Sequence, residues 1–506
     1  MKAIIRRKLA AEKASILGRL DAARRASGEV PMLAASNIHY ELAQKTSATA
    51  HGGIGAIHGL VRKTGLAKRI DEKVHLLKTH APYHESDHVL NIAYNALCGG
   101  RRLDDIELRR NDRVFLDALG AKSIPDPTTA ADFCRRFDAD AIQSLADAIN
   151  ETRLHVWKQL GPAFTSQTAR IDADGSTVST KGKCKEGMDI AYNGVWGYHP
   201  LLVSFANTGE PLSIVNRPGN RPSHEGVAPE FDDAIALCRR AGFKDILLRG
   251  DTDFSLTAEF DWWDEEGVRF IFGYDAHKNI VAIADGHPDD LYRELERRAE
   301  RVVATKERTR AVDVKDQIVR ERGYETLRLD YEDVVDFEYR PGKCRKTYRV
   351  VALRKNITHT RGDTALFDEI RYFFYITNDF NLSCHDVVHE AHQRCNQENL
   401  IEQLKNGVRA LHAPINTMNA NGAFMLMASI AWTLKAWFAL MLPVSPRWRS
   451  RHSAERDELL RMEFRTFVNS IINIPAQIVR AGRRIIYRLL AWNRFEHVLF
   501  RFLDGH

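Results

Sequence analysis

The amino-acid sequence predicts an α/β protein in which a mixed sheet with packed helices is flanked by helical N- and C-terminal regions. Residues 1–150 are rich in Ala, Leu, Lys, Arg and Asp and contain few β-branched runs, which favours helices. Residues 165–261 alternate strand-like runs, a turn, a helical stretch and a further apolar run, the pattern of a sheet covered by helices. Residues 262–382 carry more strand-like runs, and helical periodicity returns over residues 383–443.

Length and composition indicate a large globular protein. The 506 residues, 44% apolar and 28% charged, are enough for several domains with a sizeable core. Seven scattered cysteines without paired spacing argue against a disulfide framework and favour a reducing cytoplasm. The basic N-terminus has no apolar run long enough for a signal peptide. The most apolar stretch, residues 422–443, contains Lys435, so we interpret it as a buried helix and expect no membrane contact.

Positive charge is concentrated in the tail, residues 444–506. This segment has twelve Arg, no Lys and six acids, so its excess of +6 equals the net charge of the whole chain. We expect an arginine-rich helical tail, which suits contact with DNA phosphates but is equally typical of a solvated helical face. Residues 1–150 are a second candidate for binding DNA ends, although acids are interspersed among their arginines.

Carboxylates stand at the ends of two predicted strands. Asp172 and Asp174 are two residues apart in a strand-like segment, so their side chains project from the same face. Asp251 follows the apolar run 246–248 and the turn after it, at the end of a second predicted strand. Acids at the ends of adjacent strands converge.

A third carboxylate comes from a predicted helix that contains the segment HQRCNQENLIEQLKNG. At 100° per residue, Glu398 lies about 40° around the helix from Arg394, and Lys405 about 20° from it. This face could be an ion-paired surface or could contact a ligand. Three carboxylates suit hard cations such as Mg²⁺ or Mn²⁺, and two such ions roughly 4 Å apart assist both the attacking and the leaving oxygen of a phosphodiester.

These motifs together resemble the DDE transposases of bacterial insertion sequences, most closely the group thirteen-eighty kind. The resemblance rests on the Asp-containing strand, on RGDTDF at 249–254, on the strand-rich insertion, and on R-x3-E-x6-K in the last helix. The segment Glu186 to Gly194 also fits the E-G-x-x-x-x-Y-N-G pattern of these proteins. Two departures are Ala391, which stands where the family has tyrosine, and Asp253, a second acid in RGDTDF.

The resemblance implies a ribonuclease-H-like core, interrupted by a β-rich insertion, that cuts the terminal inverted repeats of a transposon and joins them to target DNA. Such an enzyme acts on double-stranded DNA, as at least a dimer, in the nucleoid of the bacterial cytoplasm. Carried over by position, Asp174, Asp251 and Glu398 bind two divalent metal ions, while Arg394 and Lys405 contact phosphates. Asp172 is the alternative first acid and Glu402 the alternative third.

The resemblance also implies that aromatic residues of the insertion stack on a flipped base, for which the candidates are Trp262 and Trp263. Three other interpretations stay open. The acids would equally serve a ribonuclease-H-like nuclease without strand transfer, and the protein could be a non-catalytic DNA-binding protein. A zinc site is compatible with the spacing of Cys384, His385, His389, His392 and Cys395.

Overall fold

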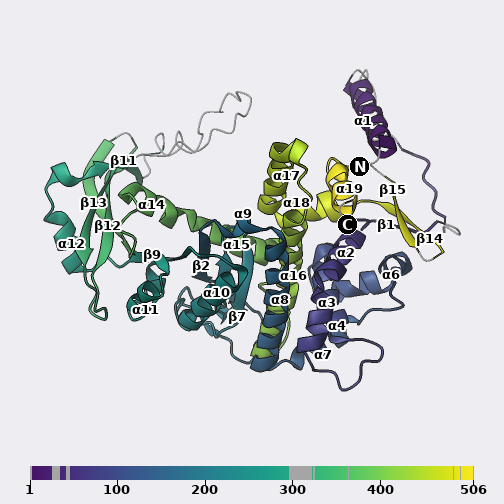
Figure 1. Ribbon diagram of the computed structural model, residues 1–506, viewed down its shortest axis with the longest axis horizontal. Helices are drawn as coiled ribbons and strands as arrows, with labels where there is room; N and C mark the ends of the chain where they lie inside the picture. The colour runs from purple at the N-terminus through teal and green to yellow at the C-terminus, as the bar shows by residue number, and fades with distance from the viewer. Residues whose placement is uncertain are drawn as a thin grey trace.

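The computed structural model describes residues 3–24, 35–41, 46–295, 322, 325–362, 364–482, 484–490 and 492–504. Their central feature is a mixed sheet of nine strands, in the order β10-β11-β12-β13-β9-β8-β2-β6-β7, with helices on both faces (Figure 1). The predicted α/β class with a large mixed sheet is confirmed.

The core of the sheet is organised around β2 (Ala169–Gly175). On one side β6 and β7 continue antiparallel, and on the other β8 and β9 run parallel to β2 and to each other. Parallel neighbours need crossover connections, which here contain the helices α10 and α11. The bounds are β6 (Leu201–Phe205), β7 (Glu210–Val215), α10 (Val227–Ala241), β8 (Ile246–Gly250), α11 (Phe260–Glu265) and β9 (Arg269–Tyr274).

The strand-rich insertion extends this same sheet as long antiparallel hairpins at one end of the molecule (Figure 1). It comprises α12 (Lys278–Asp285), β10 (Arg293–Glu294), β11 (Glu325–Tyr339), β12 (Tyr348–Arg361) and β13 (Thr364–Thr377). Residues 374–377 of β13 pair with β9, which is itself a core strand parallel to β8. The first strand after the predicted start of the insertion at residue 262, β9, thus pairs both with β8 and with the insertion strand β13.

The two faces of the sheet are covered by different helices. Leu247 and Ile271 pack against Val387 and Val388 of α14 (Cys384–Gln393), the helix that covers one face. The other face packs against α10 and α8 (Ala139–Gln159), where the apolar side chains of β2 belong to the main core. The predicted continuous helix after residue 383 is interrupted. α14 ends at Gln393, Arg394 separates it from α15 (Cys395–Glu402), and residues Gln403–Gly407 form a π-helix, η4.

The most apolar segment forms α16 (Met418–Leu440), which packs against α4 (Glu85–Leu97), α8, α17 (Arg449–Arg461) and β7. Among the described helices it alone is long and apolar enough to cross a membrane, and the apolar window lies entirely inside the protein. Lys435 is buried in this helix, where its Nζ donates to Leu460 O at 2.8 Å and lies 3.9 Å from the centre of the Trp432 ring. The predicted buried helix is confirmed.

The region before β2 is mainly helical. Its helices are α1 (Ala3–Arg24), α2 (Ile54–Thr64), α3 (Leu66–Lys73), α4 (Glu85–Leu97), α5 (Ile106–Arg110), α6 (Arg113–Leu119), α7 (Pro127–Arg135), α8 and α9 (Pro162–Thr165). A small sheet of β3 (Val178–Ser179), β5 (Trp196–Tyr198) and β4 (Asp189–Ile190) follows β2.

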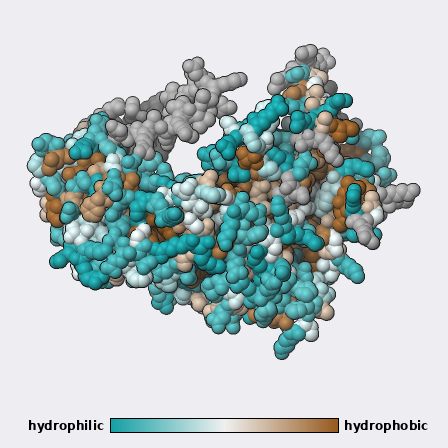
Figure 2. Space-filling view, in the orientation of Figure 1, coloured by the Kyte–Doolittle hydropathy of each residue, from teal (hydrophilic) through white to brown (hydrophobic). Residues whose placement is uncertain are grey.

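The face seen in Figure 2 is largely hydrophilic, with hydrophobic residues gathered over the β11–β13 end.

The arginine-rich tail is not wholly helical, contrary to the prediction. It contains α17 (Arg449–Arg461), α18 (Phe464–Phe467), the π-helix η6 (Val468–Ile472), β14 (Ala476–Ala481), β15 (Arg484–Leu489) and α19 (Glu496–Asp504). The two strands form a hairpin that pairs with β1 (Ala48–Thr49). Ile478 and Val479 in β14, and Ile485 and Ile486 in β15, favour the extended backbone. The tail thereby packs on the N-terminal region.

Candidate active site

The strands that carry the predicted acids are tied together by a buried ion pair. Arg249 Nε and Nη2 donate to the two carboxylate oxygens of Asp172 at 2.7 and 2.8 Å. These residues face each other in the register of β2 and β8, and both are almost fully buried. Arg249 also donates to Glu390 of α14 at 3.1 Å, and Glu390 accepts in turn from Arg170 of β2. Asp172 is therefore committed to a structural network.

Asp174 and Asp251 each follow a member of this pair by two residues and line one cleft of about 720 Å³. Asp174 lies near the end of β2, and Asp251 directly follows β8. The Asp251 carboxylate accepts from Asp253 N at 3.0 Å, which fixes the turn after the strand. Lys405 of η4 lines the same cleft. The structure brings these three predicted residues together from segments far apart in the chain.

Arg394 lies between the first and third predicted acids. Its Nη1 is 3.5 Å from Asp174 Oδ2, and its Nη2 is 4.0 Å from Glu398 Oε1. The Arg394 side chain is mostly buried and Nη1 has no hydrogen-bond partner in the described part of the chain, whereas the Glu398 side chain is 64% exposed. The guanidinium therefore bridges two carboxylates loosely and keeps a buried N–H group for another acceptor.

The carboxylates of the cleft are not fully neutralised. Burial raises the pKa of Asp174 to about 6, opposed by Arg394 and reinforced by Asp251 and Glu398. Burial likewise raises the pKa of Asp251, again opposed by Arg394 and reinforced by Asp253 and Glu398. Glu398 thus acts on both strand acids, whereas its alternative Glu402 accepts from Asn406 at 2.7 Å. Excess negative charge at one place favours a bound cation.

The donor chemistry fits a hard divalent cation. Asp174, Asp251 and Glu398 offer only carboxylate oxygens, the ligands that Mg²⁺ and Mn²⁺ prefer. With Arg394 between them, however, no three His, Cys, Asp or Glu side chains in the described ranges are spaced as a finished metal site. The cleft is therefore suited to the ion by charge and ligand type, with Arg394 lying between Asp174 and Glu398.

Comparison with known proteins decides the family. A sequence model of the family described as "Transposase DDE domain group 1" matches residues 36–503. The chain belongs to this family. The protein is thus a DDE transposase, an enzyme that cleaves DNA and transfers its strands, and DDE transposase domains use divalent metal ions.

A cryo-EM structure of a piggyBac transposase synaptic complex with hairpin DNA is similar at a TM-score of 0.36 and 10% identity, covering 83% of this chain and 84% of that chain. The search of curated proteins gives no match.

The two tryptophans predicted to stack on a flipped base lie elsewhere in the transposase. Trp263 is 1% exposed, packs among the Phe side chains of the core, and donates to Asp232 at 3.2 Å, so this prediction is wrong. Trp262 is 53% exposed, but it lines a hollow against α10. Because α10 covers the sheet face opposite to α14, Trp262 lies on the wrong side for the cleft.

The alternative zinc site is not formed. Cys384 Sγ donates to Asp336 at 3.3 Å, His389 is bonded to Gln393 at 2.7 Å, and His392 is bonded to the Tyr375 hydroxyl at 3.1 Å. These side chains have separate partners on different elements, and Cys395 is exposed. No such cluster is present in the ranges that the structure describes.

Several cleft residues were not singled out from the sequence. The cleft is also lined by Gly175, Ser176, Thr177, Tyr192, Asn193, His199, Gly219, Asn220, Arg221, Pro222 and Ser223. A Cβ on Gly175 would come 2.4 Å from His199 Nε2, so glycine permits the close approach of this ring. Burial, helped by Arg217 and Lys405, lowers the pKa of His199 to about 4. Only the motif from Glu186 to Gly194 pointed to this wall.

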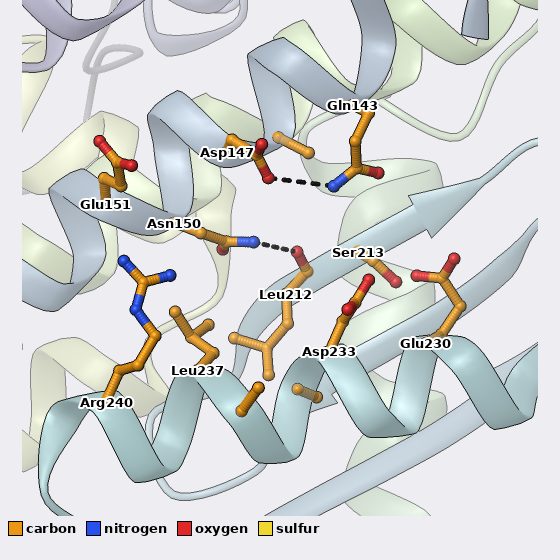
Figure 3. A pocket seen from close by; sticks show the side chains of 13 residues that line it. Gln143, Asp147, Asn150, Glu151, Leu212, Ser213, Glu230, Asp233, Leu237 and Arg240 are labelled. Atoms are coloured by element: carbon orange, nitrogen blue, oxygen red, sulfur yellow. Dashed lines mark hydrogen bonds between the residues drawn. The ribbon is translucent and has the colours of Figure 1, made fainter. Parts of the chain in front are cut away.

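A second hollow lies between α8, β7 and α10 (Figure 3). Carboxylates from both helices, including Asp147, Glu151, Glu230 and Asp233, surround it, with Arg240 at its edge. It is on the α10 side of the sheet, contains none of the predicted site residues, and its acidic lining does not suit a DNA backbone.

Proposed function

We propose that this transposase cuts the terminal inverted repeats of a bacterial insertion sequence of the group thirteen-eighty kind and joins the freed 3′-hydroxyl to target DNA. The observation that carries the proposal is that Asp174 and Asp251 end adjacent parallel strands in one cleft, with Glu398 on the helix beside them. The antiparallel run β2-β6-β7, with β8 and β9 parallel beyond β2, supports a ribonuclease-H-like core.

The proposed roles follow from the geometry. Asp174, Asp251 and Glu398 would hold two divalent ions, Mg²⁺ or Mn²⁺, which assist the attacking and leaving oxygens of the phosphodiester. Arg394, whose buried Nη1 has no hydrogen-bond partner in the described part of the chain, would donate to a phosphate oxygen of the bound DNA. Lys405, on the cleft wall, neutralises a second phosphate.

DNA leaving the cleft would follow an arginine surface, defined as Arg101, Arg102, Arg409 and Arg465. Arg465 of α18 donates to Asn406 O at 3.1 Å, so the tail docks beside Lys405 on η4. Burial and the charges of the other three arginines lower the pKa of Arg409, which has a positive φ of 61° and a buried Nε without a partner in the described chain. Four guanidiniums near one another suit contact with a polyanion.

This surface supports a shared role for the two regions that were candidates for binding the transposon ends. Arg101 and Arg102 come from the N-terminal helical region, whereas Arg465 comes from the tail. We propose that both contact the same duplex. We propose that the enzyme acts as at least a dimer in the DNA complex, because two ends must be paired, and that it works at the bacterial nucleoid.

The experiment is an assay with purified protein, Mg²⁺, a supercoiled target plasmid and duplexes that carry the element's ends. We expect cleaved ends and joined product, both lost with EDTA. Asp251→Asn should lower cleavage by more than about a thousandfold because a metal ligand is lost, while the variant still shifts end DNA in a gel. Cleavage without joined product would favour a nuclease, and cleavage by the Asn variant would refute the site.

A further inference from the structure

An exposed tyrosine is presented to the cleft by a short, tight hairpin. Tyr192 lies in the turn between β4 and β5, and its side chain is 89% exposed. Two bonds of 2.8 Å close this turn, from Ala191 N to Val195 O and from Gly194 N to Ala191 O. Gly194 has a φ of 79°, which glycine adopts without strain. The hairpin thus projects a large ring into solvent.

The base of this hairpin is anchored to the rest of the protein. Glu186 N donates to Asn416 O at 2.8 Å, and the Tyr198 hydroxyl donates to Glu186 O at 2.7 Å. A Cβ on Gly187 would lie 2.8 Å from Met418 Sδ, so the loop is packed closely against the start of α16. The ring is therefore exposed on a supported frame, which reduces the entropy lost when a ligand stacks on it.

Tyr192 and Asn193 line the cleft that also holds Asp174 and Asp251. The same cleft contains Asn220, and the ring centre of Tyr192 is 6.4 Å from that of His199 in an edge-on arrangement. Most of the Tyr192 surface is exposed to solvent. A phosphodiester that reaches the two aspartates must bring its attached nucleobases into this cleft. Aromatic faces and amide groups are the protein features that stack on bases and bond to their edges.

We propose that Tyr192 is the stacking platform for the nucleobase next to the scissile phosphate, with the amides of Asn193 and Asn220 at the base edge. This inference rests on the proposed function. It gives a role to the motif Glu186 to Gly194, and it assigns base stacking to the wall of the cleft instead of to Trp262.

The test compares Tyr192→Ala and Tyr192→Phe with Trp262→Ala, a matched control that removes another exposed aromatic from the opposite sheet face. Single-turnover cleavage of an end duplex should fall by about 10- to 100-fold for Tyr192→Ala and stay near wild type for the other two. On a duplex with an abasic site at the terminal position, Tyr192→Ala and wild type should cleave at the same rate, because this duplex has no base to stack on the ring.

A second readout needs no cleavage. In the Asp251→Asn background, 2-aminopurine at the terminal position should change fluorescence on binding, and Tyr192→Ala should abolish this change while leaving the melting temperature unaltered. Equal cleavage and equal fluorescence for Tyr192→Ala and its parent would overturn the proposal. If the wild type does not cleave at all, the proposed function fails, whereas the fluorescence comparison still decides the role of Tyr192.

Discussion

Arg249 of β8 binds both carboxylate oxygens of Asp172 of β2, at 2.7 and 2.8 Å, across the two strands whose next same-face residues are Asp251 and Asp174. The pair lies beneath the cleft and sets the register of its two strand acids. A sequence containing two aspartates two residues apart does not reveal which one is used for chemistry. The geometry separates them, since Asp172 is saturated by Arg249 and Asp174 opens to the cleft.

Breaking this pair should destabilise the fold. Removing one partner leaves the other charge buried and unpaired, so we expect Asp172→Asn and Arg249→Met each to lower the free energy of unfolding by about 3–5 kcal/mol. The double variant should lose less than the sum of the two single losses. Thermal melts of the four proteins measure this coupling, and additive losses would contradict it.

Metal binding should weaken at acidic pH. The pKa of Asp174 is raised to about 6, so the carboxylate is protonated at pH 5 and ionised at pH 7. Because a metal ligand must lose its proton, Mg²⁺ affinity should fall by about tenfold from pH 7 to pH 5. Calorimetric titration of the DNA-free protein with Mg²⁺ measures this affinity. Asp174→Asn should bind Mg²⁺ weakly at both pH 5 and pH 7, and an unchanged pH dependence in that variant would exclude Asp174 as the group responsible.

Arg394 should oppose metal binding before DNA arrives. It lies 3.5 Å from Asp174 and 4.0 Å from Glu398, where its charge competes with a cation. We expect Arg394→Ala to bind Mg²⁺ about two- to tenfold more tightly without DNA yet to cleave at least about tenfold more slowly, since it loses a phosphate contact. Arg394→Lys keeps the charge and should resemble wild type in metal affinity. Weaker Mg²⁺ binding by the Ala variant would refute this arrangement.

The arginine surface should contribute to DNA affinity through phosphate contacts. Arg409→Gln is expected to weaken binding to all duplex sequences alike and to reduce the salt dependence of the binding constant by about one charge. Arg239→Gln is the matched control, because Arg239 is on α10 and is paired with Glu266 at 2.9 Å. Fluorescence anisotropy across a series of salt concentrations measures the salt dependence of the binding constant for both variants. Equal salt dependence for the two variants would show that Arg409 does not contact DNA phosphates.

The buried charge of Lys435 should lower the free energy of unfolding below neutral pH. Burial lowers its pKa from the ordinary 10.5 to about 7, so the unfolded state binds the proton more readily between these values. The cost is fully present below pH 7 and is relieved as pH rises toward 10.5. Lys435→Met should therefore stabilise the protein by about 1–3 kcal/mol at pH 6 and less at pH 10. Lys244→Met, at an exposed position, should show no such trend in denaturant melts.

The alternation of helical and strand-like texture, the buried apolar helix and the acids at strand ends could be predicted from the sequence, because periodicity and turn residues are local properties. The position of β9 in the sheet could not be predicted, because its apolar pattern is the same whether it pairs with β8 or with β13, and in the structure it pairs with both. The tail hairpin was missed because an arginine-rich composition does not reveal that β14 has β1 as a neighbour.

Only the tertiary structure decided how segments that are distant in the chain lie relative to one another. Two adjacent tryptophans look alike in the sequence, but Trp263 is enclosed by core phenylalanines and Trp262 faces α10. The same holds for Tyr192, which a hairpin places in the cleft that also contains the two aspartates. The sequence by itself determined which side chains can hold metal, grip phosphate or stack on bases. Which of them meet depends on strand register and helix packing, whose free energies arise from contacts across the whole chain.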